Sequence, residues 1–190
     1  IAKGSDTNHF NYFSKNGSCT AILEALNANA QNPVTLFKKQ QYTDGERGIL
    51  LDALSLKGVN FSPEKITRDV VFIVPGIMGS TIERNGDHQW VNMRKLNDGG
   101  ISKNLNISAD KVEASGVIEK YYNDLAEQLL GQYDVITMQF DWRKSLKDAA
   151  KILKQKIEDI LKKHNVKVHI IAHSMGGLLV RQVMMDFPDT

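Results

Sequence analysis

The sequence lacks the features that mark several classes of protein. It has one cysteine, Cys19, so no disulfide can form within the chain and nothing in it requires an oxidising compartment. Its longest apolar run, residues 70–74, is far shorter than the roughly 20 residues that span a bilayer. Its 24 basic and 22 acidic residues give a net charge of only +2, which excludes a broad affinity for nucleic acid.

Several recognisable site motifs are missing as well. The chain has no His-Glu-x-x-His metal motif, no Gly-x-x-x-x-Gly-Lys phosphate loop and no Cys-x-x-Cys pair, so we predict no metal site and no cofactor. It begins Ile-Ala-Lys-Gly without a methionine or an apolar signal core, which leaves open both a cytoplasmic location and export without a visible signal. With 42% hydrophobic and 24% charged residues, its composition is that of an ordinary globular protein.

Two parts of the chain differ in pattern. Residues 1–68 predict a helical segment of unassigned role, with helices near 21–30 and 45–56. From residue 69 onward strands and helices alternate, which predicts a mostly parallel sheet with helices on both faces, an α/β fold. The predicted strands are 70–74, 133–140 and 167–172, and the predicted helices are 118–130, 145–164 and 178–187. Residues 81–117 are expected to be polar and irregular, with turns at 85–87 and 98–100, and to form part of a lid or entrance.

The third predicted strand runs directly into Ala172-His173-Ser174-Met175-Gly176-Gly177, hereafter the elbow segment, and a helix follows. A strand–turn–helix around Ser-x-Gly is typical of a nucleophile elbow, in which small flanking residues let a tight turn expose the serine. Ser174 is therefore the predicted catalytic nucleophile, and the Met175 N–H is a predicted oxyanion donor. The alternative is a serine that merely caps the following helix.

A second oxyanion donor is expected from the Pro-Gly loop, residues 75–80, which follows the first strand. Gly76 after Pro75 would let the backbone approach the serine closely, and Ile77 would present its N–H. A simple turn is the alternative. After the second strand, Asp141, Trp142 and Arg143 (the Asp-Trp-Arg segment) are expected to line a substrate pocket or, structurally, to hold their own loop in place.

Together these segments resemble the lecithin:cholesterol acyltransferase-like lipase/acyltransferase family of α/β-hydrolases. The resemblance covers about residues 69–190 and rests on Val74-Pro75-Gly76-Ile77-Met78-Gly79-Ser80, Phe140-Asp141-Trp142-Arg143 and the elbow segment. It implies a serine esterase that cleaves acyl esters of lipids, or passes the acyl group to an alcohol. It also implies a lipid or other acyl-ester substrate and transient contact with a membrane surface.

The chain departs from this pattern after the serine. In α/β-hydrolases the acid and the histidine of the triad follow the nucleophile, but residues 175–190 contain no histidine. We therefore expect a hydrolase domain truncated after the nucleophile helix, nearly inert alone, with its remainder after Thr190. If the acid and histidine were missing altogether, a non-catalytic module that binds lipid or protein would be the alternative.

Overall fold

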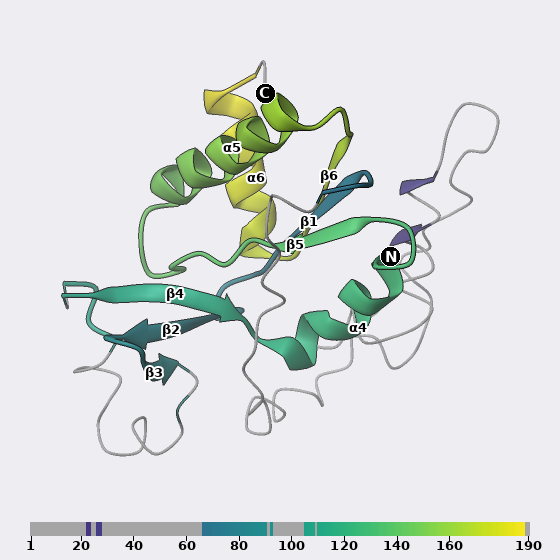
Figure 1. Cartoon of the computed structure of the whole chain (residues 1–190). Helices are drawn as coiled ribbons and strands as arrows, with labels where there is room; N and C mark the ends of the chain where they lie inside the picture. Colours follow the sequence, from purple (N-terminus) through teal and green to yellow (C-terminus); the bar gives the residue numbers. More distant parts are fainter. Residues whose placement is uncertain are drawn as a thin grey trace, which may run out of the picture.

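The computed structural model describes residues 22–23, 26–27, 66–90, 92, 105–108 and 110–188. Strands and helices alternate along most of this part of the chain (Figure 1). The elements are β1 (Val70–Val74), β2 (Ser80–Arg84), β3 (Asp87–Trp90), β4 (Val112–Val117), α4 (Glu119–Leu129), β5 (Asp134–Thr137), α5 (Leu146–Lys163), β6 (Val168–Ala172) and α6 (Met175–Asp186).

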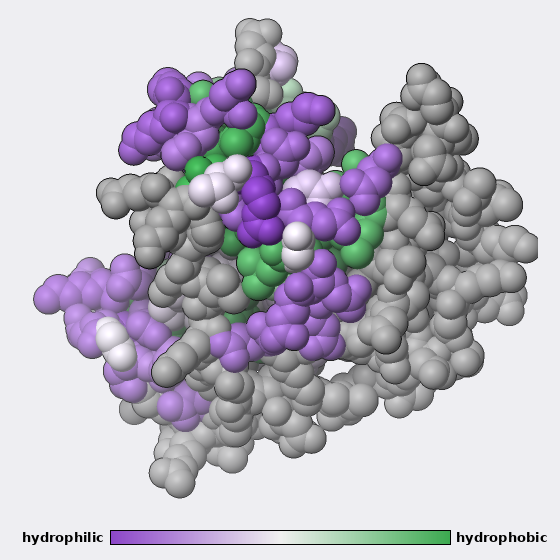
Figure 2. Space-filling model, turned by 45° about the vertical axis from the view of Figure 1, so that its right-hand side comes forward, coloured by the Kyte–Doolittle hydropathy of each residue, from purple (hydrophilic) through white to green (hydrophobic). Residues whose placement is uncertain are grey.

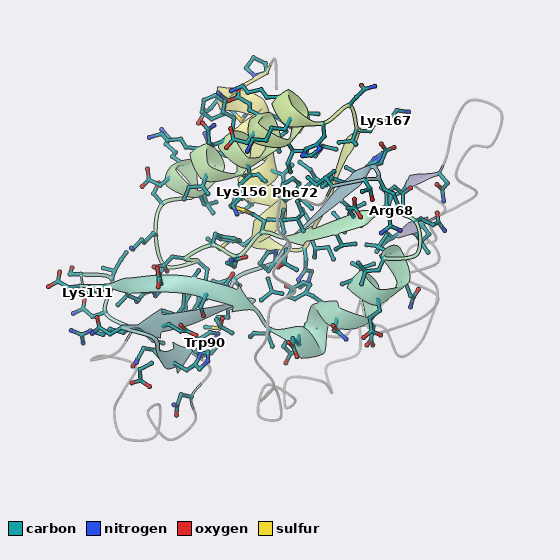
Figure 3. The ribbon with its side chains drawn as sticks, viewed as in Figure 1. Arg68, Phe72, Trp90, Lys111, Lys156 and Lys167 are labelled. Atoms are coloured by element: carbon teal, nitrogen blue, oxygen red, sulfur yellow. The ribbon has the colours of Figure 1, made fainter. Side chains whose placement is uncertain are left out.

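A parallel sheet of order β5–β1–β6 forms the centre of the fold, as the alternation of strands and helices predicts. All five residues of β1 are buried, because this β-branched and aromatic run is covered on both faces. Its Phe72 lies in the interior (Figure 3), whereas the lysines labelled in that figure are exposed. Helices α5 and α6 pack on the face of Phe72, and α4 packs on the face of Val71 and Ile73.

Carboxylates fix the beginnings of these strands. The Asp134 carboxylate of β5 accepts hydrogen bonds from the Thr67 N–H (2.7 Å) and the Arg68 N–H (2.9 Å), and pairs with the Arg68 guanidinium at 3.0 Å. The Asp69 carboxylate accepts a bond from the Lys167 N–H at 2.8 Å, across 98 residues of sequence. The residues that flank β1 thus tie both neighbouring strands to it.

Part of the N-terminal segment contacts the sheet. Ile22, Leu23 and Leu26 are partly buried against the α4 face, and the Tyr133 hydroxyl donates a hydrogen bond to Asn27 Oδ1 at 3.1 Å. These residues fall within the helix predicted at 21–30, and Ile22, Leu23 and Leu26 are helical. The helix predicted at 45–56 lies outside the described residues, and the boundary at residue 68 stays a prediction.

The expectation that residues 81–117 are irregular was wrong for their described part. Strands β2, β3 and β4 form an antiparallel sheet of order β3–β2–β4. The turn predicted at 85–87 joins β2 to β3, and positive φ angles at Asn85 (52°) and Gly86 (76°) fit a type I′ hairpin. The strands were missed because they are short and rich in polar residues. The turn predicted at 98–100 lies outside the described residues.

Two of the predicted element boundaries shift. Helix α6 begins at Met175, directly after the serine, rather than near residue 178. Strand β5 ends at Thr137 although the apolar pattern runs to Phe140, whose N–H donates to the Ser80 hydroxyl. Among the described residues, no helix combines the length and the apolar character that crossing a membrane requires.

Candidate functional site

The Pro-Gly loop and the elbow segment leave adjacent parallel strands at the same edge of the sheet. Val74, at the end of β1, is the register partner of Ala172, at the end of β6. The His173 N–H continues this pairing with a 3.0 Å hydrogen bond to the Val74 carbonyl. The two segments predicted to cooperate in one site are therefore neighbours at the carboxyl edge.

Ser174 occupies a strained turn between β6 and α6. Its φ of 54° and ψ of −121° lie outside the regions that L-residues favour, a conformation that costs about 1–3 kcal/mol and is typical of functional sites. Its side chain is exposed and makes no capping hydrogen bond to α6. The described geometry thus disagrees with the alternative in which this serine merely caps the helix.

Glycines allow three stretches of backbone to meet here. A Cβ on Gly176 would lie 2.5 Å from the Pro75 carbonyl oxygen, and one on Gly76 would lie 2.9 Å from the Ser174 Cβ. Both positions therefore exclude a side chain. Gly177 differs, because a Cβ there would contact nothing within 4 Å among the described residues.

Two backbone N–H groups beside Ser174 have no acceptor among the described residues. The N–H groups of Gly176 and Gly177 bond to the carbonyls of His173 and Ser174, but the Met175 N–H has no such partner. The Ile77 N–H likewise has none. An N–H without a protein acceptor is ordinary in the first turn of a helix and in an exposed loop, and next to a nucleophile such groups can donate to an oxyanion.

The Pro-Gly loop is a tight turn held at several points. The Gly79 N–H donates to the Gly76 carbonyl at 3.0 Å, and Met78, between them, has a φ of 60°. A positive φ at the third residue is typical of a type II turn, and glycine normally occupies this position. The indole N–H of Trp90 donates to the Met78 carbonyl at 2.9 Å and so helps to hold this strained residue.

Tyr122, on α4, connects the loop to the elbow segment. Its oxygen accepts a hydrogen bond from the Gly76 N–H at 3.0 Å and lies 3.0 Å from Nδ1 of His173. Burial of the phenol, and secondarily the nearby Tyr121, raises the pKa of Tyr122 to about 12, although the Gly76 N–H lowers it. Sequence reasoning counted Tyr122 only as part of an apolar helix face. The signal was available, because a buried tyrosine hydroxyl normally needs a polar partner.

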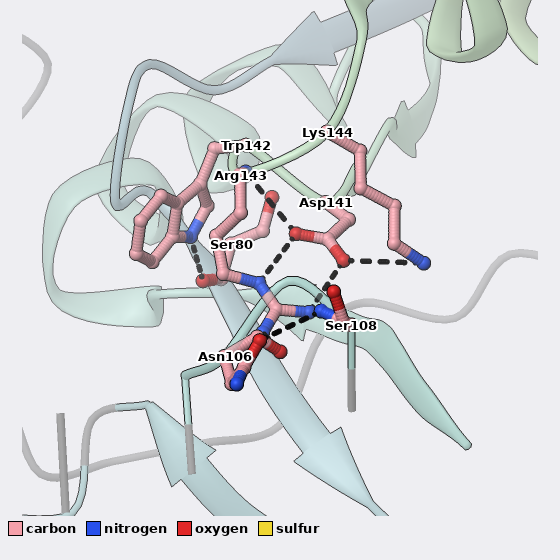
Figure 4. Close-up of polar contacts among 7 residues, drawn as sticks. All are labelled: Ser80, Asn106, Ser108, Asp141, Trp142, Arg143 and Lys144. Atoms are coloured by element: carbon pink, nitrogen blue, oxygen red, sulfur yellow. Dashed lines mark hydrogen bonds and ion pairs between the residues drawn. The ribbon is translucent and has the colours of Figure 1, made fainter. Parts of the chain in front are cut away.

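The Asp-Trp-Arg segment at the same edge is internally paired (Figure 4). The Arg143 guanidinium contacts both carboxylate oxygens of Asp141, at 2.8 and 2.6 Å, and donates to the Asn106 carbonyl at 3.3 Å. The Trp142 indole N–H donates to the Ser80 carbonyl at 3.2 Å, and its ring meets that of Trp90 edge to face. These contacts match the structural interpretation, while the lining of a pocket stays a prediction.

The charges around Asp141 favour its ionised form. Burial alone would raise the pKa of this carboxyl, but hydrogen bonds from Arg143 and the positive charges of Arg143 and Lys144 lower it below its ordinary value of 3.8. The Arg143 side chain is only 6% exposed and that of Asp141 11%. Their charges are therefore used in holding the segment together.

The loop and the helix next to the serine carry exposed apolar side chains. Ile77 and Met78 in the Pro-Gly loop are 54% and 40% exposed, and Leu178, one helical turn after Ser174, is 58% exposed. On the face drawn in Figure 2, apolar residues (green) are visible between hydrophilic ones (purple). Exposed apolar side chains on the segments next to a nucleophile suit a substrate with a hydrocarbon chain.

The described part of the chain offers Ser174 no base and no metal. The serine hydroxyl has no hydrogen-bond partner there, and the described histidines (His88, His164, His169 and His173) include none bonded to it. No group of three metal-ligating side chains occurs among these residues. His9 lies outside them.

The fold and this edge define a mixed α/β protein with a serine at a strand–helix turn. The chain belongs to the lecithin:cholesterol acyltransferase family, whose model matches residues 83–189, more than half of its length. That family consists of lipase-like enzymes that hydrolyse or transfer acyl esters, and it implies the α/β-hydrolase fold. The match includes the Asp-Trp-Arg and elbow segments and begins after the Pro-Gly loop.

Part of the chain is also similar to a curated protein of unassigned function. Over 71 residues the chain is 39% identical to Uncharacterized protein YJR098C of Saccharomyces cerevisiae. The aligned region covers 33% of this chain and 11% of that protein, so the chain spans only a small part of its relative's length. No solved structure matches the chain significantly.

Proposed function

We propose that this chain carries the nucleophilic half of a serine hydrolase that cleaves acyl esters of lipids, with Ser174 as the nucleophile. The observation that carries the proposal is the conformation of Ser174: a strained, exposed serine between a parallel strand and a helix, without a capping bond. The N–H groups of Met175 and Ile77 are the proposed oxyanion donors. Membership of the lecithin:cholesterol acyltransferase family supports a lipid ester as substrate.

The proposed reaction has two steps. In the first, Ser174 Oγ attacks the acyl carbonyl and its proton passes through a base to the leaving alcohol, so that an acyl-serine forms as the ester bond breaks. In the second, water attacks the acyl-serine, which releases the fatty acid and restores the hydroxyl. The negative charge that develops on the carbonyl oxygen in each step is held by the two N–H groups.

Transfer to an alcohol is the second candidate function, and the family match favours it because acyltransferases are members. It differs from hydrolysis only in the second step, where an alcohol replaces water. The two are separated by supplying a labelled lipid ester together with an alcohol acceptor and measuring the ratio of new ester to free fatty acid. A ratio that does not rise with acceptor concentration would exclude transfer.

The base and the acid that activate Ser174 are proposed to lie after Thr190. A serine hydroxyl without a base is a weak nucleophile, so the 190-residue chain should react slowly if at all. Comparing this chain with a longer form of the protein, under the same conditions, tests the point. Equal reactivity of the two would contradict it.

A serine-directed fluorophosphonate probe tests the proposed nucleophile directly. The full-length protein should be labelled on Ser174, and Ser174→Ala should lose both labelling and ester hydrolysis. The matched control is Ser145→Ala, because Ser145 also precedes a helix but caps it through its side chain. That variant should lose about 1 kcal/mol of stability and none of its labelling. Labelling of Ser174→Ala at the wild-type rate would overturn the proposal.

A further inference from the structure

We propose that Tyr122 is a positioning residue that holds the oxyanion loop against the nucleophile turn. Its phenol bridges the Gly76 N–H and His173 Nδ1, each at 3.0 Å. The inference rests on the proposed function, because it assigns Tyr122 a role only if Ser174 is the nucleophile and Ile77 an oxyanion donor.

The bridge joins segments that are distant in the sequence and adds to the strand pairing between β1 and β6. Gly76 follows β1, His173 immediately precedes Ser174, and Tyr122 comes from the helix on the opposite face to α5 and α6. The two bonds of Tyr122 span 46 and 51 residues of sequence. One hydroxyl therefore gives the loop a direct side-chain connection to the residue before the serine.

The site is built to hold this hydroxyl. Tyr122 is 2% exposed, and a Cβ on Gly79 would lie 2.7 Å from its oxygen, so a glycine makes room for it. A phenol with an ordinary pKa of 10 is already protonated at neutral pH, and burial raises this pKa further. A protonated oxygen that accepts from Gly76 still has a proton to donate, and Nδ1 of His173 is the acceptor at the right distance.

The bridge also decides which loop N–H faces the substrate. The Gly76 N–H is occupied by Tyr122, and the Gly76 carbonyl by the Gly79 N–H. These two bonds hold both backbone polar groups of Gly76, and so fix the orientation of the peptide between Gly76 and Ile77. The Ile77 N–H has no acceptor among the described residues. Without the phenol, the Gly76 N–H would have no acceptor in this position. We expect the loop to shift as a result, and the Ile77 N–H to shift with it.

The test compares Tyr122→Phe with Tyr121→Phe in the full-length protein, assayed on a short-chain p-nitrophenyl ester. Tyr122→Phe keeps the ring but loses the bridge, and should lower kcat by roughly tenfold with little change in KM, since only a fraction of one donor's effect is lost. Tyr121→Phe removes a neighbouring hydroxyl that has no partner among the described residues, and should leave kcat unchanged. Ser174→Ala is assayed beside them.

Each outcome bears on one claim. Wild-type kcat in Tyr122→Phe with an inactive Ser174→Ala would overturn the role of Tyr122 and leave the proposed function intact, whereas an active Ser174→Ala would overturn the proposed function. An equal loss in Tyr121→Phe, or a kcat that merely follows the folded fraction, would also overturn the role of Tyr122.

If Tyr122→Phe does not fold, nitrogen NMR of the wild-type protein decides. His173 should carry its proton on Nε2, and a proton on Nδ1 would overturn the bridge as proposed.

Discussion

The elbow segment and the Asp-Trp-Arg segment follow β6 and β5, the two strands that flank β1, but they are held in opposite ways. The elbow segment depends on missing side chains, because Gly176 and Gly76 let backbones meet. The Asp-Trp-Arg segment depends on long polar side chains that bond to one another and to nearby carbonyls. The first leaves the Ser174 hydroxyl and the Met175 N–H without partners among the described residues, while the second satisfies its charges. Polar groups left unsatisfied are what a substrate can use.

The largest effect is expected where a side chain is forced into the elbow. Gly176→Ala would place a methyl group 2.5 Å from the Pro75 carbonyl oxygen, so β1 and α6 would have to move apart. We expect a loss of about 3 kcal/mol in the free energy of unfolding and roughly a hundredfold in kcat. Gly177→Ala is the matched control, since the space there is open and alanine favours a helix by about 1 kcal/mol. Similar losses in both variants would contradict the idea that space decides.

A smaller loss is expected in the segment held by charge. Arg143→Met would leave the Asp141 carboxylate without its main partner, and should cost about 2–3 kcal/mol in the free energy of unfolding. Lys144→Met removes only an exposed contact at 3.6 Å and should change that free energy by about 0.5 kcal/mol or less. Urea denaturation of both variants measures the difference. A cost in Lys144→Met as large as in Arg143→Met would show that the guanidinium pairing does not hold the segment.

Acid should remove the difference between Asp141 and its neutral analogue. The pKa of Asp141 lies below 3.8, so its charged form stabilises the fold above the pKa of the unfolded chain, and this contribution disappears as pH falls through the folded pKa. The gap in the free energy of unfolding between wild type and Asp141→Asn should be constant near neutral pH and close below about pH 4. Urea midpoints between pH 7 and pH 2 test this; a gap that widens in acid would refute the assignment.

The smallest effect concerns Trp142. Trp142→Phe keeps an aromatic ring beside Trp90 but loses the hydrogen bond to the Ser80 carbonyl, which should cost about 1 kcal/mol in thermal or chemical unfolding. If Trp142 only supports the fold, kcat and KM should stay at wild-type values. A change in KM without loss of stability would instead favour the predicted role of this segment as a pocket wall.

The parts of the fold that sequence predicts well are those with strong hydrophobic periodicity. The run at 70–74 is a fully buried strand, and the helix predicted at 145–164 is observed at Leu146–Lys163 with Ser145 as its cap. Strand order and the antiparallel sheet were not predictable in this way. Strands such as Val112–Val117 carry few apolar residues and gain their stability from pairing with distant segments, which a local pattern does not report.

In the candidate site, too, the features with a local sequence pattern were predictable and those that depend on distant contacts were not. The tight turn around Ser174 needs particular residue types at fixed spacing, so the pattern predicts it, and the glycine contacts agree with that reasoning. The Tyr122 hydroxyl indicates that a polar partner is needed, but its partner His173 lies 51 residues away and the helical pattern does not identify it. Contacts between distant elements depend on the packing of the whole domain, and no spacing rule encodes them.

The burial of β1 on every side has a consequence before the chain is folded. Val70–Val74 is a short, uncharged segment of high strand propensity, the kind that aggregates when it is exposed, and its partner strand β6 is synthesised much later. Arg68 and Asp69 precede it and Pro75 follows it, which is the arrangement of gatekeeper residues that discourages aggregation. In the folded protein the same two charged residues fasten β5 and β6. The charged residues that protect the strand during synthesis thus hold the neighbouring strands in place once the sheet has formed.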